Sequence, residues 1–174
     1  ETQLVVIGRG TECGGNIGVV LDSVTSSYAA VVGDVIYIGS RNGGGWSSTK
    51  IASPLSPNWI VLNKNTGELI GEDGSGASAS ALHAAWSSLT YGKIGGEEIL
   101  IWGGTDGYCY GYPTKTEKDA DGYELFNPSW KVDCNEPHYR KDKNGKKVPY
   151  ATPPGPSELI GTPVLYKGKV YCAI

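Results

Sequence analysis

The chain has 174 residues, a net charge of −3 at neutral pH, and many turn-forming residues, with 26 Gly and 10 Pro. This length supports one domain with its own core, and so small a net charge excludes a broad electrostatic attraction to nucleic acid or anionic lipid. No stretch approaches the roughly 20 apolar residues that cross a bilayer as a helix.

Two apolar runs around a tight glycine turn occur three times, at residues 28–40, 87–104 and 161–174. Apolar positions recur with a period of two between Gly, Pro, Asn and Asp residues, which is typical of β-hairpins. No segment has a convincing helical pattern. The repetition indicates one supersecondary unit that is stacked several times.

Further strands complete two of these units. Residues 59–71 predict two strands joined by an Asn-Thr-Gly turn, in which Gly67 supplies a positive φ. After the second hairpin, residues 108–112 and 129–134 predict a third and a fourth strand. The last unit begins near Ile160 and has only two strands.

We therefore predict an all-β fold, a β-propeller of four-stranded antiparallel blades, of which this chain holds about two and a half. Residues 1–27 form a strand and turn segment that can end a preceding blade, and residues 28–83 form a first PQQ-like blade. Residues 84–158 form a second blade with long loop insertions, and residues 159–174 begin a truncated third blade. Because a closed propeller needs at least about four blades, we expect a fragment of a longer protein, whose remaining blades cover the open edges.

The length beyond that of a plain blade lies in the loops 41–58, 114–128 and 135–158. Insertions that recur between the same strands of each unit gather on one face of a propeller, and that face often binds a partner. Three aromatic residues of these loops are candidate binding residues: Trp46, Tyr123 and Tyr139. The basic run 140–147 surrounds an Asn-Gly dipeptide, which predicts a solvated hairpin tip, with a phosphate-binding patch as the alternative.

The blades carry a family pattern. Residues 32–39 (Val-Gly-Asp-Val-Ile-Tyr-Ile-Gly), followed by residues 60–69, resemble the repeat of PQQ-type β-propellers, and residues 162–171 resemble its first half. Residues 84–134 look like the blades of large secreted bacterial proteins with PQQ-like repeats. The Trp that usually closes such a blade is present as Trp130 in the second unit but absent from the first, so we expect the first interface to be filled differently.

This resemblance implies a non-catalytic scaffold, similar to the outer-membrane barrel-assembly propeller, that presents loops to a protein partner in the bacterial periplasm or outside the cell. The alternative is a fragment of a quinoprotein dehydrogenase, an oxidoreductase that uses PQQ and Ca²⁺. Such an enzyme would need an adjacent Cys-Cys disulfide, a Ca²⁺ held by Glu and Asn, and a catalytic Asp. The chain has no adjacent Cys pair, so we expect no PQQ site in this segment and assign no catalytic residue.

Two groups of residues suggest other chemistry. An acidic turn holds Asp119, Asp121 and Glu124, which makes it a candidate Ca²⁺ site. We favour a solvated acidic turn, because the segment lacks the later bidentate Glu of a full calcium loop. His83 and His138 have no carboxylate or Cys at ligand spacing, so we expect structural or surface roles for them.

The four cysteines, Cys13, Cys109, Cys134 and Cys172, are candidate disulfide partners. An even count in strand-like surroundings suits an oxidising compartment, and three connectivities are open. Buried free thiols in a cytosolic protein are the alternative. We favour the periplasm or secretion, partly because of the resemblance to secreted bacterial proteins.

Overall fold

The computed structural model describes residues 8–9, 17–18, 29–40, 42–45, 47–150 and 155–174. Within these residues the chain is all-β, with four separate sheets, none of which closes on itself. Helical structure is limited to two single turns, η1 (Ala77–Ser80) and α1 (Pro137–Arg140), which the sequence pattern did not predict. Neither turn, and no other helix in the described part of the chain, is long and apolar enough to span a membrane.

The first sheet has six strands in the spatial order β10-β11-β6-β5-β4-β3. Their bounds are β3 (Ala30–Val32), β4 (Val35–Gly39), β5 (Trp59–Asn63), β6 (Leu69–Asp73), β10 (Glu117–Lys118) and β11 (Glu124–Phe126). Strands β3 to β6 form an antiparallel meander in chain order, at the positions that the sequence predicted.

The second sheet has four antiparallel strands in the order β12-β9-β8-β7. A two-stranded hairpin follows it near the end of the chain, and we call this pair the C-terminal hairpin. The bounds are β7 (Thr90–Ile94), β8 (Glu97–Gly103), β9 (Tyr108–Pro113), β12 (Trp130–Asp133), β13 (Val164–Tyr166) and β14 (Lys169–Tyr171). A small pair, β1 (Gly8–Arg9) and β2 (Ile17–Gly18), precedes them. The rest of the strand and turn segment expected at residues 1–27 lies outside the described residues.

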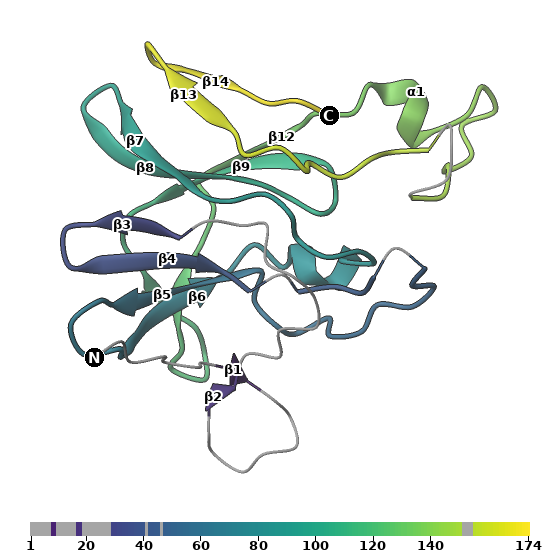
Figure 1. Ribbon diagram of the computed structural model, residues 1–174. Coiled ribbons are helices and arrows are strands. Elements are labelled where there is room, and N and C mark those ends of the chain that lie inside the picture. Colours follow the sequence, from purple (N-terminus) through teal and green to yellow (C-terminus); the bar gives the residue numbers. More distant parts are fainter. Residues whose placement is uncertain (1–7, 10–16, 19–28, 41, 46, 151–154) are drawn as a thin grey trace.

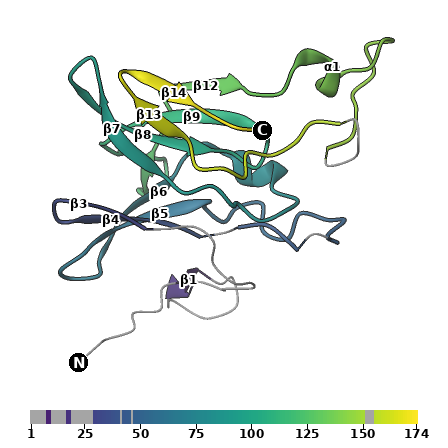
Figure 2. The same cartoon turned by 45° about the horizontal axis from the view of Figure 1, so that its top comes forward.

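The first sheet, the second sheet and the C-terminal hairpin are stacked as three successive layers (Figures 1 and 2). The first strand of the second sheet, β7, contacts the first strand of each neighbouring layer, β3 and β13. The hydroxyl of Thr90 donates a hydrogen bond to the carbonyl of Pro163, which joins the start of β7 to the start of the C-terminal hairpin. The backbones of neighbouring layers therefore approach each other closely at their first strands.

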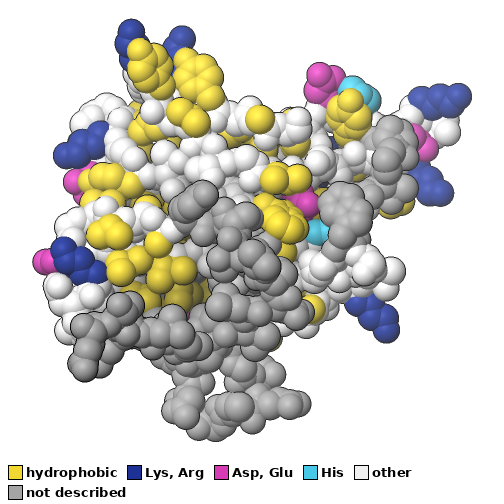
Figure 3. All heavy atoms as spheres, viewed as in Figure 1, with side chains coloured by type: hydrophobic (Ala, Val, Ile, Leu, Met, Phe, Trp, Pro, Cys, Tyr) yellow, Lys and Arg dark blue, Asp and Glu magenta, His cyan; other side chains and the backbone are white. Residues whose placement is uncertain are grey.

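The C-terminal hairpin has one covered face and one open face. Leu165 and Val170, which are cross-strand partners, pack toward the second sheet. Val164 and Tyr171, the next cross-strand pair, are 57% and 52% exposed. Figure 3 shows hydrophobic side chains at the surface over this hairpin. The outermost layer thus presents apolar side chains to solvent.

Glycines form the tight turns that the hairpins require. Gly67 has φ 75°, and the side-chain oxygen of Asn63 accepts hydrogen bonds from the backbone of Asn65 and Thr66 in the same turn. Gly95 and Gly96 both have positive φ, 62° and 92°, between β7 and β8. Two consecutive positive φ angles fit the tight two-residue turns whose twist matches that of antiparallel strands.

The loop 114–128 behaves differently from the other two long loops. It joins β9 to β12, so it lies at the end of the sheet opposite to the loops 41–58 and 135–158. It also forms β10 and β11, and β11 pairs in parallel with β6, the last strand of the first sheet. A segment that belongs in sequence to the second sheet thereby extends the first.

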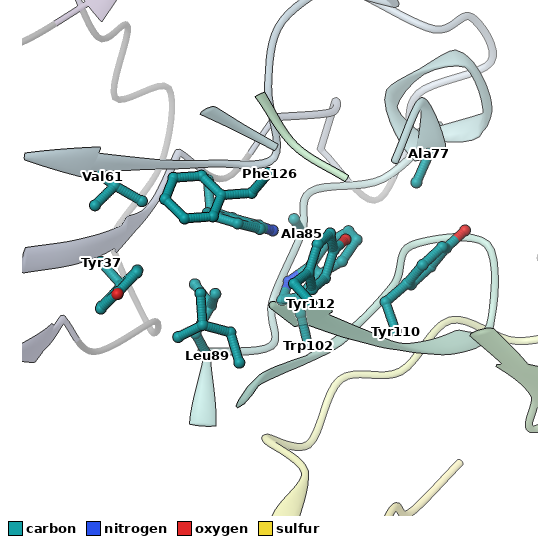
Figure 4. Packing of buried hydrophobic residues seen from close by; sticks show 11 residues of the cluster. Tyr37, Val61, Ala77, Ala85, Leu89, Trp102, Tyr110, Tyr112 and Phe126 are labelled. Carbon is teal, nitrogen blue, oxygen red and sulfur yellow. The ribbon is translucent and has the colours of Figure 1, made fainter. Parts of the chain in front are cut away.

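The largest core lies between the first and second sheets (Figure 4). Its buried residues are Tyr37, Trp59, Val61, Ala77, Ala85, Leu89, Leu100, Trp102, Tyr110, Tyr112 and Phe126. Phe126, from β11, packs 5.5 Å from Trp59 between ring centroids. A Cβ on Gly71 would lie 3.0 Å from the Phe126 ring. The first interface is therefore filled by an aromatic residue that the crossing loop brings in.

Strand β8 is buried on both faces, which explains its unbroken apolar run. Leu100 and Trp102 face the first sheet, whereas Ile99 and Ile101 belong to a second core beneath the C-terminal hairpin. Successive side chains of a strand point to opposite faces, so a strand between two layers needs apolar residues at every position. The other buried members of the second core are Cys109 and Leu159.

Candidate functional site

Four connections meet at one end of the stacked layers, which we call the loop end. They are the described residues of the segments 40–58, 74–89, 104–107 and 134–163. Consecutive antiparallel strands alternate in direction, so every second connection falls at the same end. In Figure 1 the loop end lies at the right, and the short turns of β3–β4, β7–β8 and β13–β14 lie at the left.

A buried polar cluster joins two of these segments, 74–89 and 134–163, at the loop end. His83 and Glu158 are each 5% exposed, and the Nδ1 atom of His83 lies 3.9 Å from the Oε1 atom of Glu158. The hydroxyl of Tyr150 donates a 2.7 Å hydrogen bond to the other carboxyl oxygen of Glu158. The rings of His83 and Tyr150 lie 5.8 Å apart between centroids. An acid, an imidazole and a phenol thus share one buried space.

The backbone around His83 is tightly fixed. The amide of Gly44 donates to the carbonyl of Leu82, and the amide of Ala84 donates back to the carbonyl of Gly44, both at 3.0 Å. A Cβ on Gly43 would lie 2.1 Å from the carbonyl oxygen of His83, and Gly43 has φ 123°. Glycine is therefore needed there, because the two segments approach more closely than a side chain permits.

A second polar cluster fixes the segment around α1. Arg140 donates from Nε and Nη2 to the two carboxyl oxygens of Asp133, at 2.9 and 2.7 Å, and from Nη2 to the backbone carbonyl of Asp106 at 2.8 Å. The guanidinium also lies 4.8 Å from the centroid of the Tyr108 ring. Burial works to raise the pKa of Asp133, but the hydrogen bonds and charge of Arg140 contribute to a net lowering. This forked pair is a strong form of ion pair.

Asn135 links the beginning and the end of the connection 134–163. Its side-chain amide donates to the carbonyl of Ser157 at 3.0 Å, and its side-chain oxygen accepts from the amide of Ser157 at 2.8 Å. A Cβ on Gly107 would lie 2.1 Å from the Asn135 amide nitrogen. The loop end is consequently a set of loops held in place by reciprocal polar contacts.

Burial raises the pKa of Glu158, although the hydrogen bond from Tyr150 and the nearby His83 work to lower it. In the unfolded chain this carboxyl ionises near its ordinary pKa of about 4.3. As the pH rises from there through the higher folded pKa, the unfolded state loses its proton first, so Glu158 makes the fold less stable. Well below about pH 4 both states are protonated, so this destabilisation is absent there.

We therefore expect Glu158→Gln to gain stability relative to the parent chain as the pH rises from about 4 to 7. Glutamine keeps an oxygen that accepts from Tyr150 but cannot ionise. Urea unfolding of both chains across this range measures the difference, and Glu97→Gln, at an exposed position, serves as the control. A difference that shrinks or changes sign as the pH rises contradicts the expectation, because it would mean that His83 pairs with an ionised Glu158.

Two of the three candidate calcium residues, Asp119 and Glu124, accept hydrogen bonds from nearby residues. The Asp119 side chain accepts hydrogen bonds from the backbone amides of Asp121 and Tyr123, at 2.9 and 2.8 Å. Glu124 accepts a 2.6 Å hydrogen bond from the hydroxyl of Thr116. Across the described residues, no group of three or more His, Cys, Asp or Glu side chains is arranged to hold a metal ion. These contacts fit a solvated acidic turn.

The candidate binding aromatics do not form one surface. Tyr139 lies in α1 at the loop end and is 37% exposed, whereas Tyr123 is 46% exposed in the crossing loop at the opposite end. Trp46 lies outside the described residues. The His138 ring lies beside that of Tyr139, with centroids 4.0 Å apart and the ring planes tilted by 39°. The basic run 140–147 makes the turn that its Asn-Gly dipeptide predicted, since Gly145 has φ 76°.

Three of the four cysteines come together beside the C-terminal hairpin. Cys109, Cys134 and Cys172 carry free thiols, and Cys13 lies outside the described residues. Sequence reasoning missed Tyr150, Glu158 and the Arg140–Asp133 pair, because the irregular segments between the partners have no period that predicts which side chains meet. A single charge before Leu159 was the only local signal for Glu158.

No protein-family model matches the chain, and a search of curated proteins returns no match.

Proposed function

We propose that the chain is part of a β-propeller in which each sheet is a blade, and that it acts as a non-catalytic scaffold in the periplasm or outside the cell. The arrangement of the layers supports this. β7 lies against both β3 and β13, as the inner strands of neighbouring blades do around a common axis. A propeller also requires each blade to bury its faces against its neighbours, as the second sheet does.

The open face of the C-terminal hairpin supports a further blade. Val164, Tyr166 and Tyr171 all lie on this face and are more than half exposed, at 57%, 57% and 52%. Adjacent exposed apolar residues on a strand pair are unusual unless another surface covers them. A further blade of the same protein is the partner that the scaffold proposal assigns to this face.

The observation that carries the binding role is the construction of the loop end. Long loops gather there, and the Glu158 and Arg140 clusters hold them in fixed positions. Preorganised loops bind a partner with less loss of conformational entropy than mobile ones. α1 projects from this end (Figure 2) and presents Tyr139, a residue type that is enriched at protein interfaces.

The test compares two exposed tyrosines at opposite ends of the layers. The chain is immobilised and exposed to a periplasmic or extracellular extract, and captured proteins are identified by mass spectrometry. We expect Tyr139→Ala to reduce capture of the main partner about tenfold, as loss of a central aromatic contact does. Tyr123→Ala is the matched control and should capture as much as the parent chain.

Loss of capture with Tyr123→Ala alone, or equal capture by both variants, contradicts the assignment of the loop end as the binding surface. Oxidoreductase activity of the purified chain with added PQQ contradicts the non-catalytic role. Both variants change exposed residues, so circular dichroism should confirm that each keeps the fold of the parent chain.

A further inference from the structure

The topology brings three thiols to one seam between the second sheet and the C-terminal hairpin. Cys109 is the cross-strand partner of Val132, so Cys134, two residues after Val132, lies on the same face as Cys109. Cys172 follows Val170 by two residues. Val170 and Cys134 both pack against the second core, which contains Cys109. The Cys172 thiol lies close enough to the other two thiols to raise the pKa of each.

The three thiols differ in access to solvent. Cys172 is exposed and Cys134 is half-buried, whereas Cys109 is only 3% exposed within the second core. The Sγ atom of Cys134 lies 3.7 Å from the carbonyl oxygen of Val132, to which it donates. A disulfide reagent in solution therefore reaches Cys172 first. Cys134 is the next most accessible.

The two thiols beside Cys172, those of Cys134 and Cys109, differ in reactivity as well as in access. Burial, and then the neighbouring Cys172 thiol, raise the pKa of Cys134 to about 11 and that of Cys109 further. Thiolates, not thiols, attack disulfides. Of the two sulfurs that can reach Cys172, Cys134 thus has the larger reactive fraction.

We propose that Cys172 and Cys134 form a thiol–disulfide exchange site that accepts small disulfides and closes into a cross-link between the C-terminal hairpin and the second sheet. The Cys172 thiolate attacks one sulfur of the small disulfide, forms a mixed disulfide and releases one small thiol. The Cys134 thiolate then attacks the Cys172 sulfur and releases the second small thiol. The two cysteines lose two electrons and two protons in total, and the small disulfide is reduced to two thiols.

Cys109 has a secondary role in this site. It lies within reach of Cys172, but its burial keeps it from competing while Cys134 is present. The cross-link would close the segment from 134 to 172, which contains α1 and the C-terminal hairpin. It therefore anchors the outermost layer, whose open face has no cover within the described residues.

The experiment treats the reduced full chain with oxidised glutathione, blocks the remaining thiols with a maleimide, and maps the peptides by mass spectrometry without reduction. We expect a peptide pair that joins Cys134 to Cys172 and is lighter by two hydrogens, with Cys109 labelled only after unfolding. Amide hydrogen exchange in β13 and β14 should slow when the link forms, because the link restrains local opening.

Three serine variants make the assignment specific. Cys172→Ser should abolish the link, Cys134→Ser should move it to Cys109, and Cys109→Ser should leave it unchanged. Cys172 is exposed, so its replacement leaves the fold intact. Free thiols at both Cys134 and Cys172 after treatment, a stable mixed disulfide at Cys172, or a link to Cys13 would each overturn the proposal.

Discussion

Trp102→Ala should lower the free energy of unfolding by about 3–5 kcal/mol, the range for removal of a large aromatic side chain from a core. Trp102 has no exposed surface, and its ring lies 5.7 Å from that of Tyr110 between centroids. It stands in the core that joins the first and second sheets (Figure 4). Its loss removes apolar contact on both sides of that interface and leaves a cavity.

Urea unfolding measures this effect, with Trp130→Ala as the matched control. Trp130 is only partly buried, at the edge of the second sheet, where its ring covers Gly111. The same chemical change should therefore cost less at Trp130. Equal losses for the two variants would show that the interface between the sheets does not dominate stability, and would weaken the view that layers are stabilised mainly by their neighbours.

Local patterns predicted the strands of each sheet well. The hairpins at 28–40, 87–104 and 161–174 contain β3–β4, β7–β8 and β13–β14. These elements depend on alternation of apolar residues and on glycine turns, both of which are visible within a few residues. The stacking of the hairpins followed from their repetition.

Long-range features were not predictable in the same way. The crossing of β11 to the first sheet depends on the fit of Phe126 over Gly71, and the two residues lie far apart in the sequence. The opposite positions of Tyr123 and Tyr139 follow from which strands their loops connect. The convergence of Cys109, Cys134 and Cys172 likewise depends on how the C-terminal hairpin lies on the second sheet.

The buried carboxylate of Asp73 shows a third kind of limit, since no local pattern marks it as a link between sheets. Asp73 ends β6, and its Oδ2 atom accepts hydrogen bonds from Asn58 at 2.8 Å and from the Ser75 hydroxyl at 2.9 Å. Its Oδ1 atom accepts from the Ser75 amide at 2.9 Å and from the hydroxyl of Tyr112, in β9 of the second sheet, at 3.0 Å. Four donors thus converge on one carboxyl group.

We expect Asp73→Ala to lower the free energy of unfolding by about 3 kcal/mol or more, because each buried donor left without an acceptor costs about 1–3 kcal/mol. Asn58 and Tyr112 have no exposed surface, so water cannot easily replace the carboxylate. Urea unfolding at neutral pH measures the loss. Tyr112→Phe, which removes one donor and keeps the ring, should cost only about 1 kcal/mol.

The double variant decides whether the carboxylate and the phenol act as a pair. Once Asp73 is replaced, the Tyr112 hydroxyl has lost its acceptor, so its removal should then cost nothing or should stabilise the chain. Groups in contact show such non-additive effects, whereas independent sites do not. If Tyr112→Phe costs the same with and without Asp73, the hydrogen bond between β6 and β9 does not hold the sheets together, and their attachment rests on the apolar core alone.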